Sequence, residues 1–375
     1  MNPHERYLAA LRGQKADRVP LELAGFLFPS REEIAQLADP LRRTIAERVH
    51  DQTHFEFQVP SHINRMLVTP PQRIRATTER LPGGGRRTRG AIDTPKGNLT
   101  YETQYNPVAA TSWHVKYPVE NEDDIEKIAS VPWELPANLA PLDLSRPPKG
   151  RRERGIVTAR ISSPFVCVAG MMNYQSFLAM TATHAELILE LTEICRRRIL
   201  DCLQVLLSRP GIECVWMGGS EWVTPPMGSP ALYDALVQEQ ERSLIQFIHE
   251  HSDAVVHVHC HGRVRDALPK VIERGGDYLE PVEAPPDGDI TMADAKRLAV
   301  GRITLGGNIE CRILCNDSEQ RVERAVRAAF EGGKERFVLR PTEGPSPLMS
   351  EREFRNYTSL VDLWKKLSPI ESSCP

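Results

Sequence analysis

From residue 154 onward, short apolar segments alternate with longer amphipathic segments, and this rhythm constrains the fold more than any other feature. The segments predicted to be strands lie at 155–161, 214–218, 254–261, 278–282, 303–307 and 337–339. The helical patterns lie at about 173–207, 230–251, 263–273, from 292, 318–332 and from 351. Strands that alternate with helices form a parallel sheet with right-handed crossovers.

Two earlier segments, 18–26 and 53–57, also have the character of strands and raise the number to eight. Eight such units close a (β/α)8 barrel. The predicted fold class is therefore α/β, a TIM-type barrel with an N-terminal hairpin-bearing segment. The alternative is an open doubly wound sheet. It calls for a glycine-rich phosphate turn after a first strand, and the sequence has none.

The 375 residues are expected to form a single barrel domain over 1–375. A hairpin-rich insertion is predicted at about 65–118, because the turn sequences Pro82–Gly85 and Thr94–Asn98 interrupt short alternating segments. An irregular connector rich in proline, arginine and lysine is predicted at about 134–152.

The composition excludes several classes of partner. With 47 Lys and Arg against 50 Asp and Glu, no global field favours a nucleic acid or a membrane surface. No apolar stretch has the length of a signal region or a membrane span. The eight cysteines contain no Cys-x-x-Cys pair, so we expect reduced thiols in a cytoplasmic protein. Cys311 and Cys315, four apart, are expected to be ordinary thiols.

The strand at 254–261 carries three histidines. His257, His259 and His261 alternate along it and share one face, whereas Cys260 points the other way. Imidazoles on a buried strand need hydrogen-bond partners or a metal ion. His259 and His261 with one carboxylate would satisfy a catalytic zinc site that keeps an open position. The carboxylate could be Glu343, Glu280 or Glu221, and the role of His257 stays open.

Function in such barrels gathers at the carboxyl ends of the strands. Those ends are rich in polar side chains from several strands. Three of them are predicted to orient the substrate or move a proton: Glu221, Glu280 and Asn308. Four more are predicted to contact the substrate: Arg160, Trp222, Glu310 and Arg340.

The order of several motifs resembles the uroporphyrinogen decarboxylase (URO-D) superfamily, especially its corrinoid-linked branch, such as the methylcobamide:coenzyme M methyltransferases. The resemblance covers most of the chain. The motifs are Pro3–Gly13 with Asp17–Pro20, Asp93–Gly97 with Thr111–Trp113, Gly219–Glu221 with Pro225-Pro226, His259–Gly262, Glu280 with Pro285-Pro286, Gly307–Glu310 and Leu339–Pro345.

Departures from the family pattern narrow what the resemblance implies. The decarboxylases proper carry an Arg-Gln-Ala-Gly-Arg segment after the first strand, and here Leu23–Phe28 stands in its place. A polycarboxylate substrate would therefore lose its main anchors. The methyltransferase branch holds zinc with a His-x-Cys and a later Cys. These positions match His259, His261 and Glu343, which implies a harder, more hydrolytic type of zinc site.

The resemblance thus implies a zinc-dependent methyltransferase or demethylase that acts on a small methylated substrate. A corrinoid protein or tetrahydrofolate would be the borrowed co-substrate, and a homodimer is expected. The alternatives are a decarboxylase or lyase that acts on a smaller acid, held by Arg160 or Arg340, and a tetrapyrrole-binding barrel without turnover.

Overall fold

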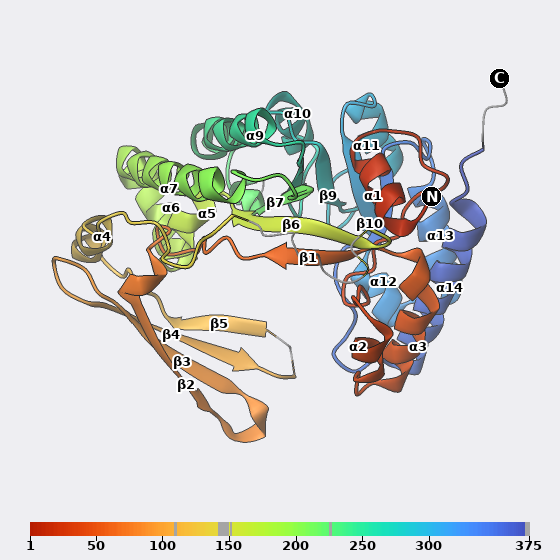
Figure 1. Ribbon diagram of the computed structural model, residues 1–375, viewed down its shortest axis with the longest axis horizontal. Coiled ribbons are helices and arrows are strands. Elements are labelled where there is room, and N and C mark those ends of the chain that lie inside the picture. Colours follow the sequence, from red (N-terminus) through yellow and green to blue (C-terminus); the bar gives the residue numbers. More distant parts are fainter. Residues whose placement is uncertain (109–110, 142–149, 151, 225–226, 372–375) are drawn as a thin grey trace.

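A computed structural model describes residues 1–108, 111–141, 150, 152–224 and 227–371. Seven parallel strands form one curled sheet in the order β1-β6-β7-β8-β9-β10-β11 (Figure 1). Their bounds are β1 Phe55–Val59, β6 Gly155–Ser162, β7 Cys214–Gly218, β8 Val255–His259, β9 Tyr278–Val282, β10 Thr304–Ile309 and β11 Phe337–Pro341. The expected parallel α/β architecture is therefore present.

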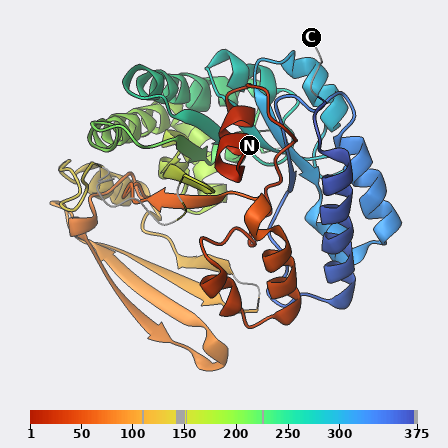
Figure 2. The same ribbon diagram turned by 45° about the vertical axis from the view of Figure 1, so that its right-hand side comes forward.

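Helices lie around the outside of the curl (Figure 2). Those at the N-terminal end are α1 Pro3–Leu11, α2 Arg31–Ala35, α3 Pro40–Val49 and α4 Glu122–Ala129. Those between and after the later strands are α5 Pro164–Ala169, α6 Tyr174–Thr183, α7 Ala185–Leu206, α8 Pro230–Tyr233, α9 Glu239–His251, α10 Ala267–Glu273, α11 Met292–Ala299, α12 Cys311–Asn316, α13 Glu319–Ala329 and α14 Glu351–Leu367. Among the described residues, no helix is long and apolar enough to cross a bilayer.

Local sequence signals explain where these helices begin and end. In α14, Ser350 accepts a hydrogen bond from the backbone N–H of Glu353, acidic residues fill the first turn, and Lys365 and Lys366 lie in the last turn. This charge order complements the helix dipole, and the capping serine satisfies an otherwise free N–H. The buried face of α14, which ends with Trp364 in the last turns, packs into the core.

The prediction of a regular strand at 18–26 is wrong, and with it the prediction of eight laddered strands. Leu21 forms an isolated parallel bridge with Leu339 of β11, supported by hydrogen bonds from Glu22 N–H to the Leu339 carbonyl and from Leu339 N–H to the Pro20 carbonyl. Pro20 has no N–H to extend the ladder. Among the described residues, no strand pairs with the outer edge of β1, so the sheet is an incomplete barrel.

Four antiparallel strands form a separate sheet that stands to one side of the curl (Figure 1). They are β2 Ile74–Arg80, β3 Arg86–Ile92, β4 Leu99–Asn106 and β5 Thr111–Lys116, within the range in which hairpins were expected. Of the expected irregular connector at about 134–152, residues 142–149 and 151 lie outside the described residues, and the described residues 134–141, 150 and 152 contain no helix or strand.

A buried ion pair fixes the loop after β7. The guanidinium of Arg274 lies 2.5 Å from the carboxylate of Glu241, and both side chains are fully buried. Glu241 also accepts a 2.6 Å hydrogen bond from Ser220, the first residue of the 3₁₀ turn Ser220–Val223. Tyr233 accepts a hydrogen bond from Arg274 at 2.8 Å. The network therefore anchors the turn that carries two of the predicted site residues.

We expect Arg274→Met to lower the free energy of unfolding by about 3–5 kcal/mol, because it leaves the Glu241 charge buried without a partner. The double variant Glu241→Gln/Arg274→Met should recover part of this loss. The more exposed pair between Arg242 and Glu239 is the control, and Arg242→Met should cost less than about 1 kcal/mol. Urea denaturation measures the free energy of unfolding of the three variants and of the wild type. Equal losses at the two arginines would contradict this account.

Candidate active site at the mouth of the curled sheet

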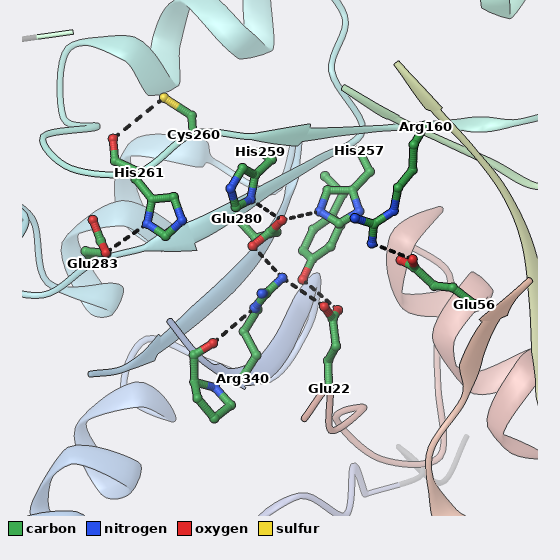
Figure 3. Close-up of polar contacts among 12 residues, drawn as sticks. Glu22, Glu56, Arg160, His257, His259, Cys260, His261, Glu280, Glu283 and Arg340 are labelled. Carbon is green, nitrogen blue, oxygen red and sulfur yellow. Dashed lines mark hydrogen bonds and ion pairs between the residues drawn. The ribbon is translucent and has the colours of Figure 1, made fainter. Parts of the chain in front are cut away.

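The carboxylate of Glu280, on β9, is the centre of the candidate site (Figure 3). Its Oε1 lies 2.7 Å from His257 Nε2 and 2.7 Å from His259 Nδ1, and Arg340 forms an ion pair with its other oxygen. Only 1% of Glu280 is exposed. Burial alone would raise its pKa, but Arg340 and the two imidazoles hold the pKa of Glu280 well below its usual range.

Arg340 is held by two carboxylates. Besides Glu280 it contacts Glu22 Oε1 at 2.8 Å, so the N-terminal segment contributes directly to the site. Glu22 also accepts hydrogen bonds from the hydroxyls of Tyr7, at 2.9 Å, and Tyr278, at 3.4 Å. Arg340 is buried, and the carboxylates of Glu22 and Glu280 already balance its charge. Its role inside the curled sheet is therefore structural: it stabilises these two buried carboxylates.

The Glu280 contact sets the tautomer of His259. An ionised carboxylate can only accept, so the imidazole nitrogen that faces it must donate. A neutral His259 therefore carries its proton on Nδ1 and has a lone pair on Nε2. The side chain is 20% exposed, and among the described residues Nε2 has no hydrogen-bond partner. His259 can thus offer one basic nitrogen to a ligand.

His261 is oriented in the same way by a different carboxylate. Its Nδ1 lies 3.0 Å from Glu283 Oε1, and the other oxygen of Glu283 accepts from the backbone N–H of Gly262. Burial lowers the pKa of His261, but the hydrogen bond and charge of Glu283 outweigh burial and raise it overall. The rings of His259 and His261 are 4.6 Å apart and nearly perpendicular, and in Figure 3 their uncontacted nitrogens face the space between them.

His259 and His261 supply part of a metal-binding site. A carboxylate on Nδ1 is the usual support for a histidine that binds a metal through Nε2, and His259 and His261 both have it. The predicted third donor, Glu343, is exposed and is not brought to them. Across the described ranges, no group of three His, Cys, Asp or Glu side chains is arranged to hold an ion. The chain therefore supplies two preoriented nitrogens rather than the three donors predicted.

A cavity of about 340 Å³ opens in front of these groups. Arg160 lies in it, 2.6 Å from Glu56 and stacked 4.7 Å from the centre of the Trp216 ring. Trp216 in turn lies 5.0 Å from the His259 ring. The lining is Glu22, Ala24, Gly25, Leu27, Glu56, Gln58, Arg160, Trp216, His257, His259, Glu280 and Arg340. Its three carboxylates outnumber its two guanidinium groups, so these groups give the cavity no excess of positive charge.

The remaining predicted residues lie around this cavity or beside it. Glu221 has one buried carboxylate oxygen with no partner in the described part of the chain. Trp222 packs edge-on against Tyr174 at 5.6 Å and away from the residues that line the cavity. Asn308 is 8% exposed and pairs in register with Arg340. Their predicted roles stay predictions.

Glu310 connects two strand ends, and its predicted contact with the substrate stays a prediction. Its Oε1 accepts from the backbone N–H of Ala284 at 2.9 Å, and Oε2 accepts from the hydroxyl of Thr342 at 3.4 Å. The side chain is buried. Burial, and then the nearby charge of Glu283, raise the pKa of Glu310 to about 7.

Sequence reasoning missed three residues of the site: Glu22, Glu56 and Trp216. Glu22 had a visible signal, since it is a charged residue within the apolar run Val19–Leu23. Such a residue is buried only when it is paired. Glu56 and Trp216 had no comparable signal, because each lies in a strand whose inward face becomes known only from the register.

The raised pKa of Glu310 predicts a pH-dependent stability. The folded state holds this proton at pH values where the unfolded chain releases it, so the contribution is full at acid pH and is lost as the pH rises towards about 7. From about pH 5 to about pH 8, we expect the wild type to lose roughly 1–3 kcal/mol relative to Glu310→Gln. Urea denaturation of both proteins at each pH tests this. Parallel pH profiles would contradict it.

Comparison with known proteins agrees with this architecture. Among curated proteins, no significant match is found. A solved methyltransferase from Methanosarcina mazei is similar over 98% of this chain and 99% of its own, with 13% sequence identity and a TM-score of 0.59, which shows a common fold. A B12-independent methionine synthase from Shewanella sp. W3-18-1, in complex with selenomethionine, covers 56% of this chain and 62% of its own, with 10% identity and a TM-score of 0.40.

The profile of the uroporphyrinogen decarboxylase (URO-D) family matches residues 106–365. This is more than half of the 375 residues and includes β6 to β11 and the centre of the candidate site. The resemblance inferred from the motifs is confirmed. The chain belongs to the uroporphyrinogen decarboxylase family.

Proposed function

We propose that this protein is a zinc-dependent methyltransferase or demethylase that moves a methyl group between a small substrate and a corrinoid or folate partner. One observation carries the proposal: His259 and His261 lie 4.6 Å apart, and each has Nδ1 held by a carboxylate. This support leaves two basic Nε2 atoms available to one ion. Water or the substrate would complete the coordination.

Bound zinc would act as a Lewis acid toward the heteroatom that bears the methyl group. The chain's own residues prepare the site. Glu280 and Glu283 keep the proton of each histidine on Nδ1, and Arg340 keeps Glu280 ionised. In the transfer itself, the bond from carbon to the heteroatom breaks, the heteroatom keeps the electron pair, and the acceptor forms the new bond to carbon. Asn308 is proposed to orient the substrate, and Glu221 is proposed to orient it or to protonate the departing heteroatom.

The charge of the cavity supports a neutral or cationic substrate. Glu22, Glu56 and Glu280 outnumber Arg160 and Arg340, and both arginines are already paired. A polycarboxylate would have to displace these carboxylates from the arginines. The volume of about 340 Å³ suits a small molecule.

Decarboxylation of a smaller acid is the second candidate. Arg160 favours it, because 42% of that side chain is exposed and the guanidinium lies at the cavity wall. A substrate carboxylate would have to replace Glu56 as its partner. This reaction would not need the zinc ion.

The proposal is tested with zinc-loaded protein, free cob(I)alamin and a panel of methoxyarenes, methylamines and methyl thioethers. We expect at least one donor to convert cob(I)alamin into methylcobalamin, which is followed by its absorption spectrum. His259→Ala and His261→Ala should lose the bound zinc and the methyl transfer together. His184→Ala, at a histidine side chain that is 47% exposed between α6 and α7, is the matched control and should keep both.

Three results would contradict the proposal. The first is a protein that retains no zinc at the histidines after reconstitution. The second is methyl transfer that survives a metal chelator. The third is release of carbon dioxide from a small acid in the presence of the chelator, lost in Arg160→Met, which would favour the decarboxylase. Binding of the corrinoid without turnover would indicate a tetrapyrrole-binding barrel.

A further inference from the structure

Two cysteines outside the histidine cluster lie face to face on the short helix α12, which follows β10. Residues four apart on a helix project from the same side, and the Sγ atoms of Cys311 and Cys315 are 3.7 Å apart. Both side chains are partly exposed and neither is in a disulfide. From the sequence, Cys311 and Cys315 were expected to be two ordinary thiols. In the structure their sulfur atoms are in contact and form a pair.

The protein holds this pair in place from both ends of the helix. The backbone N–H of Cys311 donates to the hydroxyl of Thr342 at 3.2 Å. At the other end, the buried amide of Asn356 donates to the carbonyls of Leu314 and Asp317, each at 2.9 Å. The two sulfur atoms are thus positioned before any ligand arrives, which lowers the entropy cost of binding.

Further polar groups surround the pair. Glu353, of which 1% is exposed, places Oε1 3.7 Å from Cys315 Sγ, and the Ser346 hydroxyl lies 3.6 Å from the same sulfur. The hydroxyl of the fully buried Tyr357 has no partner in the described part of the chain. Burial, and then the charges of Cys311, Glu353 and Cys315, raise the pKa of this phenol.

The spacing of the sulfur atoms matches the requirement of a metal ion. Two thiolates on one tetrahedral zinc ion, at Zn–S distances of about 2.3 Å, lie roughly 3.8 Å apart. Soft thiolate ligands select zinc and softer ions over magnesium or calcium. The carboxylate of Glu353 and the hydroxyl of Ser346, which lie beside Cys315 Sγ, could contact the ion or its bound water. Within the described ranges no complete three-donor set exists, so the two sulfur atoms must be the main donors.

We propose that Cys311 and Cys315 form a second metal site, a two-thiolate site for a thiophilic divalent cation such as zinc or cadmium, separate from His259 and His261. On binding, each thiol gives its proton to solvent and forms one bond from sulfur to the metal, so no oxidant is needed. Solvent fills the remaining coordination positions. The site is attached to the active-site mouth through Thr342, which contacts both Cys311 and Glu310.

Cadmium is the best probe, because thiolate-to-cadmium charge transfer gives an ultraviolet absorption that imidazole and carboxylate ligands do not. We expect titration of the fully reduced protein with Cd²⁺ to produce this band at one equivalent, and zinc to compete for it. Cys311→Ser and Cys315→Ser should each abolish the band. Cadmium should also protect these two thiols from alkylation, as mapped by mass spectrometry.

Two control variants distinguish cadmium bound at Cys311 and Cys315 from cadmium bound at the histidine cluster or at another cysteine. His259→Ala should keep the band, because the histidine cluster is a different site. Cys167→Ala should also keep it, since Cys167 and its neighbour Cys195 are fully buried in the core. A band that is absent from the wild type, or that persists in both folded serine variants, would overturn the proposal. So would loss of the band in His259→Ala.

Discussion

The ion-pair cluster around Glu280 is the interaction on which the candidate site depends. An isolated carboxylate at this depth would be strongly destabilising. Arg340 offsets that cost, and His257 and His259 add two hydrogen bonds to the same oxygen. Removal of any one partner leaves a buried charge undercompensated. The cluster is therefore a single unit, assembled from β8, β9 and β11.

The N-terminal segment belongs to this unit. Glu22 supplies the second carboxylate of Arg340 from a chain segment that makes only a single bridge to β11. A closed barrel would have another hydrogen-bonded strand at this position. In this protein the segment contributes the charged side chain of Glu22 instead, and the cavity is lined by Glu22 together with Glu56 and Gln58 of β1. The lumen that results holds paired charges where many barrels pack branched apolar side chains. Its excess of carboxylates disfavours polyacid substrates, which agrees with the absence of an arginine-rich segment after Leu23.

The sequence predicted the later strands well, because a buried parallel strand is a continuous apolar run with clear limits. The segments 214–218 and 278–282 match β7 and β9, and 155–161 differs from β6 by one residue. The prediction of a strand at 18–26 was wrong because apolar character did not reveal that Pro20 and the turn after Leu23 leave only two isolated bridges, from Arg18 to Pro369 and from Leu21 to Leu339. The contact between Glu22 and Arg340 could not be predicted, since it joins residues more than three hundred positions apart. The same holds for the carboxylate partners of His259 and His261, which depend on the register of β8 and β9.

The central claim is that Glu280 keeps the proton of His259 on Nδ1 and leaves Nε2 basic. The most direct test is the ¹⁵N–¹H correlation spectrum of protein labelled at histidine nitrogen, with the His259 signals assigned by their absence in His259→Gln. This account predicts a protonated Nδ1 and an unprotonated Nε2 at neutral pH, and a loss of this preference in Glu280→Gln. A proton on Nε2 in the wild type, with Nδ1 bare, would contradict it.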